Sequence, residues 1–397
     1  MMRLPMLSMR SLMSRDWLYD PKARGLLFQV LLVLALVLLG YEIVSNTAEN
    51  LTKQNIASGF GFLDRTAGFD ISQTLIAYKS TSTYGRAFLV GLLNTLVVAA
   101  IGIVLATVLG FLIGLGRLSA NWLVARLATA YVEIVRNVPL LLQLFVWYIA
   151  VLRALPMPQQ AYALLPGVHL DVRGLHAPRP LPEAGMGWVA LALVIAVALA
   201  AYMARWATQR QLQTGKTFPV AAAAAGIIVG LPLLVFLLLG APMGIEYPKL
   251  GRFNYEGGLA IEPEFMALLA GLALYTAAFI AEIVRAGIQG VARGQKEAAA
   301  ALGLRPWQVQ RLVVIPQALR IIIPPLTNQY LNLTKNSSLA VAIGYPDLVS
   351  VFAGTVLNQT GQAVEVVLIT MGVYLAISLV TALLMNWFNA RMALVER

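Results

Sequence analysis

The hydrophobic positions of the chain gather in long runs that polar segments separate. Read with a window of about 19 residues, eight runs are apolar enough to cross the roughly 30 Å of hydrocarbon in a bilayer. They cover residues 26–44, 88–116, 127–150, 188–206, 218–240, 265–284, 321–344 and 364–388. This pattern predicts an all-α, polytopic integral membrane protein with about eight transmembrane helices.

The polar segments between these runs predict the loops. Segment 45–84 is rich in Ser, Thr, Asn and Gly, segment 153–187 contains six prolines, and segment 241–263 is acidic, so all three are expected to be external loops. The first run follows a basic stretch, as a signal peptide would, but no clear small-x-small cleavage site follows Gly40. We therefore expect an uncleaved first span.

The basic residues predict the orientation. With the N-terminus inside, 18 of the 29 Lys and Arg residues lie in cytoplasmic segments and 9 lie outside, while Arg136 and Lys335 fall within apolar runs. The excess of positive charge on one side favours an N-in and C-in topology. The net charge of +11 is then a property of the cytoplasmic loops and does not indicate nucleic-acid binding.

Composition narrows the chemistry. The chain is 59% hydrophobic and 12% charged, against about 45–50% and about 25% in soluble domains. It contains no cysteine, which excludes disulfides, thiolate metal sites and cysteine nucleophiles. Its two histidines, His169 and His176, lie in a polar loop without a nearby carboxylate cluster, and we expect solvated side chains there. No metal site and no cofactor is predicted.

The long cytoplasmic stretch after the sixth run predicts two short helices with a sharp bend. A helix from about Gln295 to Leu302 should end at Gly303, and Pro306 suits the first position of the next helix. The four alanines at 298–301 would let another surface approach closely. The residues alone leave two interpretations open, a docking elbow on the cytoplasmic face and an amphipathic loop on the membrane.

This stretch resembles the EAA signature of ABC importer permeases. Glu297-Ala298-Ala299 and Gly303 are followed by Val313-Val314-Ile315-Pro316, where the family has Ile-x-Leu-Pro. In that family the EAA loop is a coupling helix that sits in a groove of the cytoplasmic ATPase. The resemblance implies an ATPase-coupling site that comprises Glu297, Ala298, Ala299, Gly303, Pro306 and Pro316.

Further stretches resemble the polar amino-acid branch of these permeases, the histidine, glutamate and glutamine type. They are Gly91–Leu96, Tyr131–Gln143, Ala281–Ile288 and Lys335–Leu339. The chain departs from this branch at Asn137-Val138, where Gly-Thr is usual, and by an insertion of about 110 residues. The long form is similar to the larger permease of general L-amino acid transport systems, which works beside a second, different permease.

The resemblance implies an ABC importer (MetI-like) permease core and a division of the chain. The expected parts are a cytoplasmic segment 1–25, a first span and external loop 26–84, a first core part 85–152, an insertion with two extra spans 153–263, and a second core part 264–390 with the coupling loop 293–316. The implied function is ATP-driven import of amino acids across the bacterial inner membrane by a non-catalytic subunit. The implied partners are a cytoplasmic ATPase dimer, a second permease subunit and a periplasmic amino-acid-binding protein.

The seventh run carries a polar stripe. Asn328, Asn332, Lys335 and Asn336 occupy positions i, i+4, i+7 and i+8, and therefore one helix face. An unpaired ammonium within hydrocarbon costs at least about 2.5–3.5 kcal/mol, so this face should meet protein, water or an anionic group. One hypothesis is that it lines the translocation path, with Lys335, Asn336, Ser337 and Ser338 at the amino-acid head group. The other is a polar seam to a partner permease.

The sequence disfavours other function classes. The nearest phosphate-loop candidate, Gly215-Lys216-Thr217, has Arg210 in place of the earlier glycine, so ATP hydrolysis must come from another chain. A membrane enzyme is disfavoured, because the sequence has no His-Glu-x-x-His pair, no Gly-x-Ser-x-Gly elbow and no carboxylate pair within an apolar run. An ion-coupled secondary transporter is the stronger alternative, but the sequence has neither two matching halves nor intramembrane acids for ion coupling.

Two weaker features concern structure. Pro139 should end or kink the third run, which places Arg136 at a re-entrant turn near the cytoplasmic face, where we expect a structural role. Glycines four residues apart, at 110 and 114 and again at 226 and 230, permit close helix packing.

Overall fold

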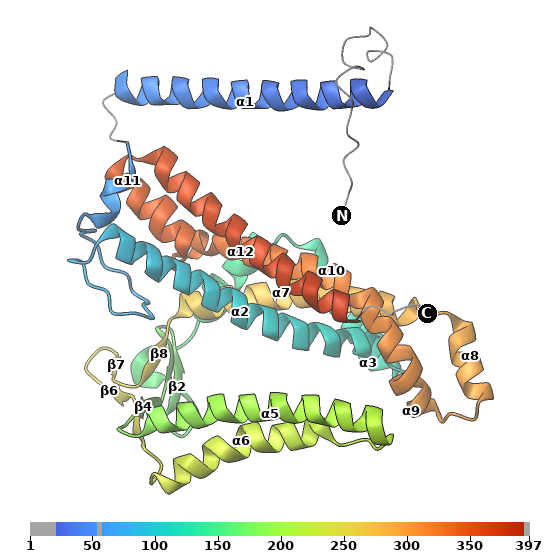
Figure 1. Cartoon of the computed structure of the whole chain (residues 1–397). Helices are drawn as coiled ribbons and strands as arrows, with labels where there is room; N and C mark the ends of the chain where they lie inside the picture. Colours follow the sequence, from blue (N-terminus) through green and yellow to red (C-terminus); the bar gives the residue numbers. More distant parts are fainter. Residues whose placement is uncertain (1–20, 54–57, 393–397) are drawn as a thin grey trace.

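The computed structural model describes residues 21–53 and 58–392, and it is mainly helical (Figure 1). Most of the predicted segment 1–25 therefore lies outside the described residues. The α-helices are α1 (Pro21–Lys53), α2 (Tyr84–Arg117), α3 (Trp122–Asn137), α4 (Leu140–Phe145), α5 (Met186–Thr214), α6 (Val220–Leu238), α7 (Pro263–Gln289), α8 (Arg293–Ala301), α9 (Pro306–Val309), α10 (Ile315–Asn336), α11 (Leu357–Thr360) and α12 (Ala363–Met392). Short 3₁₀-helices form η3 (Phe60–Asp64), η5 (Pro158–Gln160) and η7 (Ser337–Ile343). Short π-helices form η4 (Val146–Leu152), η6 (Gln310–Val314) and η8 (Val349–Val356).

The predicted spans are present. Within the described residues, 7 helices are long and apolar enough to cross a membrane, or up to 8 when one bent pair counts as a span. The bent pair is the third predicted run, in which α3 and the segment Leu140–Leu152 meet at 108°. The bend lies at Val138 and Pro139, as predicted, because proline has no N–H to continue the helical hydrogen bonds.

The core is a bundle in which α7 packs against α2 and α10, and α10 packs against α12. Glycine allows the closest of these contacts. A Cβ added at Gly110 would lie 2.6 Å from the Cβ of Ile280, and one at Gly114 would lie 2.8 Å from the carbonyl oxygen of Ala281. The second glycine pair, at 226 and 230, has nothing within 4 Å. Only the first pair therefore serves helix packing in the described chain.

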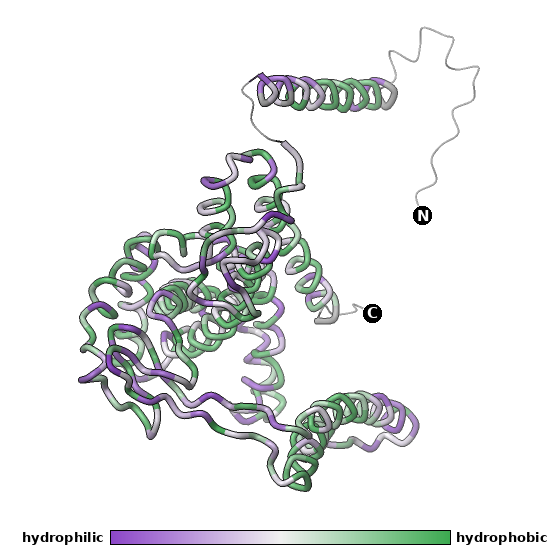
Figure 2. The backbone as a smooth tube through the Cα atoms, turned by 90° about the vertical axis from the view of Figure 1, so that its left-hand side faces the viewer, coloured by the Kyte–Doolittle hydropathy of each residue, from purple (hydrophilic) through white to green (hydrophobic). Residues whose placement is uncertain are grey.

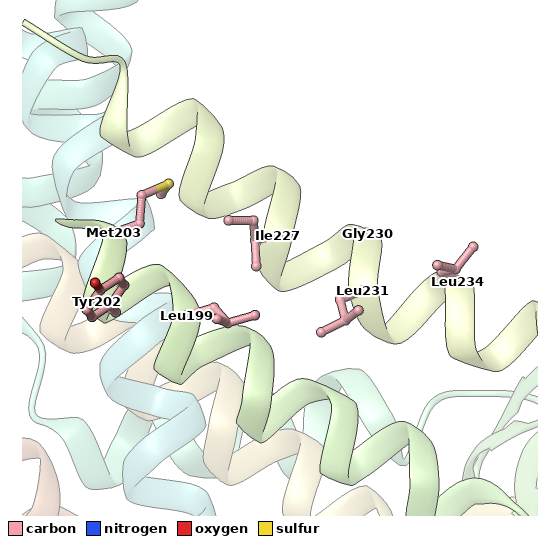
Figure 3. A pocket seen from close by; sticks show the side chains of 7 residues that line it. All are labelled: Leu199, Tyr202, Met203, Ile227, Gly230, Leu231 and Leu234. Atoms are coloured by element: carbon pink, nitrogen blue, oxygen red, sulfur yellow. The ribbon is translucent and has the colours of Figure 1, made fainter. Parts of the chain in front are cut away.

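Helices α5 and α6 form a hairpin that lies apart from the bundle (Figure 1). No residue of α6 is buried, and α5 buries only alanines, at positions 192, 196, 200 and 207. An apolar cleft of about 500 Å³ opens between the two helices (Figure 3). Its lining is Leu199, Tyr202, Met203, Ile227, Gly230, Leu231 and Leu234. This lining suits hydrocarbon and offers a charged head group almost no partner.

The predicted external loops 153–187 and 241–263 contain short strands. The strands are β1 (Tyr162–Leu165), β2 (Val168–Asp171), β3 (Gly174–Ala177), β4 (Arg179–Pro182), β5 (Met243–Glu246), β6 (Lys249–Leu250), β7 (Tyr255–Glu256) and β8 (Leu259–Ile261). They pair antiparallel as β1-β2-β3-β8, β4-β5 and β6-β7. Because β3 pairs with β8 and β4 with β5, these sheets join the two loops on either side of the α5–α6 hairpin.

The two ends of the bundle differ as the predicted topology requires. Figure 1 shows α8, α9 and the turn between α5 and α6 at one end, and the strands, η3 and α11 at the other. Figure 2 shows mainly hydrophobic long helices and hydrophilic residues mainly in the connecting segments. With N-in and C-in topology, the end that carries α8 is cytoplasmic and the end that carries the strands is external.

Candidate functional site

The predicted cytoplasmic bend is formed by α8, α9 and the residues between them. Gly303 has φ of 78°, a left-handed conformation that glycine adopts without strain. Pro306 lies in the first turn of α9, where its missing N–H costs nothing. Two hydrogen bonds close that turn: the Arg305 N–H donates to Oε1 of Gln308 at 2.9 Å, and the Gln308 N–H donates to the Arg305 carbonyl at 2.8 Å.

We call residues 293–316 the coupling elbow. Its inner side is fixed because Ala299, Val309 and Val314 are buried in the main core. Its outer side is exposed and includes Glu297 and Ala298. Leu302, directly before the bend, is 82% exposed, and Trp307, directly after it, is 56% exposed. The apex of the bend therefore presents two large apolar side chains to the surroundings.

The polar stripe on α10 divides into two parts. Asn328, Asn332 and Lys335 are exposed along one face, and Asn336 is half-buried. Within the described chain, no hydrogen bond or ion pair holds the Lys335 ammonium. The stripe therefore presents three polar groups outward from the bundle.

The two serines do not extend this face. Ser337 is fully buried, and its Oγ donates to the Thr334 carbonyl at 2.7 Å. Ser338 is half-buried, and its Oγ donates to the Lys335 carbonyl at 2.7 Å. The expectation that Ser337 reaches a substrate head group does not fit this geometry, because the side chain completes a hydrogen bond of its own helix end instead.

The bend between α3 and α4 carries a polar cluster. The Nε2 of Gln143 donates to the carbonyls of Val135 and Val138 at 2.8 and 2.9 Å, which fixes the bend from the α4 side. The guanidinium of Arg136 lies 5.2 Å from the ring centre of Phe279 on α7. Arg136 and Phe279 line a cavity of about 220 Å³ together with Glu133 and Asn137. Arg136 was singled out from the sequence and Glu133 was not, although the two are three residues apart on α3 and therefore share a helix face.

An ion cluster joins the cytoplasmic ends of α2 and α7. The Glu282 carboxylate accepts a hydrogen bond from Arg117 of α2. It also accepts two from Arg285, one turn further along α7, at 3.1 and 2.5 Å. Because α8 follows α7 after three residues, this cluster fixes the frame from which the coupling elbow projects. The signal for it, Glu282 and Arg285 at i and i+3, is visible in the sequence, but the third partner is not.

Comparison with known proteins decides among the function classes that the sequence analysis considered. The family described as binding-protein-dependent transport system inner membrane component matches residues 206–394. The general L-amino acid transport system permease protein AapQ of Rhizobium johnstonii is 57% identical over 383 residues, which cover 96% of each chain. The chain belongs to the family of ABC importer permeases.

Two further relatives of the permease match over nearly their whole length. The putative amino-acid ABC transporter permease protein YhdX of Escherichia coli is 55% identical, covering 95% of this chain and 96% of its own. The glutamate/glutamine/aspartate/asparagine transport system permease protein BztB of Rhodobacter capsulatus is 40% identical, covering 96% of both chains. These matches confirm a MetI-like, multi-pass inner-membrane permease, and they give no support to an ion-coupled carrier.

The histidines of the permease correct one expectation. His176 is only 2% exposed, and its Nε2 lies 3.3 Å from Oδ2 of the buried Asp171. Both His169 and His176 stack on the ring of Tyr255, with ring centres 4.8 and 4.7 Å apart. Burial lowers the pKa of His176, and Asp171 opposes this change. His169 of β2 and His176 of β3 are opposite each other across the strand pair, and Tyr255 of β7 stacks on both rings. The order of residues along the chain does not show these contacts.

Among the described residues, no group of three or more His, Cys, Asp or Glu side chains could hold a metal ion.

Proposed function

We propose that this permease moves amino acids across the inner membrane, that separate cytoplasmic ATPase chains drive it, and that a periplasmic amino-acid-binding protein delivers the cargo. The observation that carries the proposal is the identity of 55–57% over nearly the whole chain with permeases named for amino acids. The names of the relatives range from general L-amino acids to glutamate, glutamine, aspartate and asparagine. Their shared chemistry is the α-amino and α-carboxylate head group.

The coupling elbow is the proposed contact with the ATPase. Its bend at Gly303 and Pro306 gives it a fixed shape, and Leu302 offers a large exposed side chain at the apex. Glu297 and Ala298 lie on the exposed side of α8, while Ala299 and Pro316 anchor the elbow to the bundle. The ion cluster at Glu282 supports transmission from the elbow into α2 and α7.

The exposed face of α10 is the proposed wall of the translocation path. Asn328, Asn332 and Lys335 point away from their own bundle, and Asn336 borders this face. A second permease subunit, a different chain, would supply the facing wall. In this arrangement the lysine meets the carboxylate of the passing amino acid in a site of low dielectric, where the attraction is strong.

The proposed organisation keeps the predicted parts. A first core part (85–152) and a second core part (264–390) form the bundle, and residues 153–263 are an insertion. The arrangement of the helices supports this division, because α5 and α6 pack on each other and stand apart from the bundle.

The experiment is co-purification of the ATPase with the permease from mild detergent. We expect wild type to retain the ATPase and the variant Leu302→Asp to lose it, because a carboxylate at the apex replaces the apolar contact. Gly303→Val should also lose it, because φ of 78° is strained for a β-branched residue by about 1–2 kcal/mol. The matched control is Gly226→Val, at a glycine of α6 with no neighbour within 4 Å and no positive φ.

Retention of the ATPase by both elbow variants would place the docking surface elsewhere on the permease. Loss of the ATPase from the Gly226→Val control would mean that a valine outside the elbow has the same effect, and that the apex has no special role.

A further inference from the structure

A polar cavity of about 540 Å³ lies at the external end of the bundle, where the insertion meets the core. We call it the outer cavity. Its polar and charged lining includes Ser72, Arg153, Arg173, His176, Glu262 and Glu264. They come from the first external loop, the end of η4, the strands of the insertion and the start of α7. The cavity exists only because these distant segments meet.

Two of the charges in the outer cavity are held by the core. The Tyr148 hydroxyl donates to Oε1 of Glu264 at 2.7 Å and accepts from the guanidinium of Arg153 at 3.0 Å. The same guanidinium lies 5.1 Å from the ring centre of Tyr148. This arrangement fixes a carboxylate and a guanidinium on one wall, and each has donors or acceptors left for a further partner.

The other two charges are held by the insertion. Glu262 follows β8 directly, and its Oε2 accepts from the Ser72 hydroxyl at 3.0 Å. Arg173 lies in the turn between β2 and β3, where its N–H donates to Oδ1 of Asp171 at 2.7 Å. Next to it, Gly174 approaches β8 so closely that an added Cβ would lie 2.0 Å from the Ile261 carbonyl oxygen. The backbone around Arg173 and Glu262 is thereby fixed.

The two arginines and two glutamates of the outer cavity balance each other in charge, and they have polar atoms left to bind a ligand. In the part of the chain that the structure describes, the Arg173 side chain has no hydrogen bond or ion pair, and the Glu262 carboxylate accepts from Ser72 alone. Burial raises the pKa of Glu262, and the neighbouring Glu264 raises it further. An incoming ammonium group would relieve both effects, because an opposite charge stabilises the carboxylate.

The outer cavity also adjoins the α10 stripe along the chain. Gly344, which lines the cavity, directly follows η7, and η7 directly follows α10 with Lys335 and Asn336. At about 2.0 Å per residue, the nine residues from Lys335 to Gly344 span about 18 Å. The cavity is therefore placed in series with the proposed translocation path, on its external side.

We propose that the outer cavity binds the zwitterionic head group of a free amino acid before it reaches the α10 stripe. Glu262 and Glu264 accept from the ammonium group, and Arg173 and Arg153 donate to the carboxylate. The inference rests on the proposed function and gives the insertion a role in it. A concave site of this volume falls within the range of about 300–1,000 Å³ for small-molecule sites, and two charges of each sign match a zwitterion better than a simple anion or cation.

The test uses the complete complex of permease, partner permease and ATPase in lipid nanodiscs, without binding protein. Radiolabelled L-alanine is the probe, because its side chain is small and leaves the head group as the main contact. We expect saturable binding that unlabelled L-alanine displaces. Propionate, which lacks the ammonium, and ethylamine, which lacks the carboxylate, should fail to displace it.

Variants assign the site. Arg173→Met and Glu262→Gln should each weaken alanine binding by about tenfold or more, since each removes one charge-assisted contact. Arg179→Met is the matched control, because Arg179 is an exposed arginine of β4 outside the outer cavity, and it should bind as wild type. Retention of the ATPase by every variant shows that assembly is intact.

Two outcomes would overturn the proposal. If both variants bind alanine as wild type does, and wild type still imports amino acids with ATP and binding protein, the outer cavity is not the site although the proposed function stands. If the variants lose recruitment of the binding protein but bind alanine normally, the outer cavity is a protein-docking surface instead. Failure of wild type to import any amino acid would contradict the proposed function itself.

Discussion

At the scale of single residues, the proposed translocation path depends most on Lys335. Its ammonium is exposed on a helix of the bundle and has no partner within the described residues. An unpaired lysine in hydrocarbon is costly, so we expect this ammonium to meet protein, water or an anionic group in the assembled transporter. The two hypotheses for that group are the carboxylate of the cargo and a side chain of a partner permease.

Lys335→Met separates these alternatives. We expect uptake of amino acids to be abolished while the permease pair and the ATPase still co-purify. Lys249→Met, which changes an exposed lysine of β6, should leave uptake unchanged. Loss of assembly in Lys335→Met would show that the lysine belongs to an intersubunit seam.

Sequence reasoning at this scale succeeded where the cause is local. Gly303 and Pro306 predicted the bend, because tolerance of positive φ and a missing N–H are properties of single residues. It failed for Ser337 and His176, whose burial depends on contacts that the spacing along one helix or loop does not contain. Helical spacing placed Lys335 on the stripe, and only the structure shows that this face is exposed.

At the scale of elements, the hydropathy pattern located the long helices, since a span of hydrocarbon requires a long apolar run. It did not reveal the strands, which are two to four residues long and, in the case of β4, contain prolines. Their pairing joins β3 to β8 and β4 to β5 across the α5–α6 hairpin. Such pairing is determined by the tertiary structure and leaves no local periodicity.

The two glycine pairs give a prediction about helix packing. Gly110→Val should destabilise the permease, because its Cβ would lie 2.6 Å from the Cβ of Ile280 on α7. Overpacking of this kind costs about 1–3 kcal/mol, and we expect a lower Tm in detergent. Gly226→Val is the matched control and should leave the Tm within error, because nothing lies within 4 Å of Gly226. Equal Tm values for the two variants would contradict the close α2–α7 packing described above.

At the scale of the whole molecule, the permease combines a cytoplasmic coupling elbow, an exposed polar face on α10 and an external cavity built partly by the insertion. The first two could be proposed from the sequence, because each lies within one continuous segment. The outer cavity could not, because Ser72, Arg153, Arg173 and Glu262 meet only after folding. The three features lie in order from the cytoplasmic end of the bundle to its external end.

The most direct measurement of the central claim is uptake of a radiolabelled amino acid mixture into proteoliposomes that contain this permease, its partner permease and the ATPase. ATP is enclosed inside, and the binding protein is added outside. We expect accumulation that needs both ATP and binding protein and that a protonophore and a sodium ionophore leave unchanged. Accumulation without ATP that either ionophore collapses would contradict ATP-driven import and indicate an ion-coupled carrier.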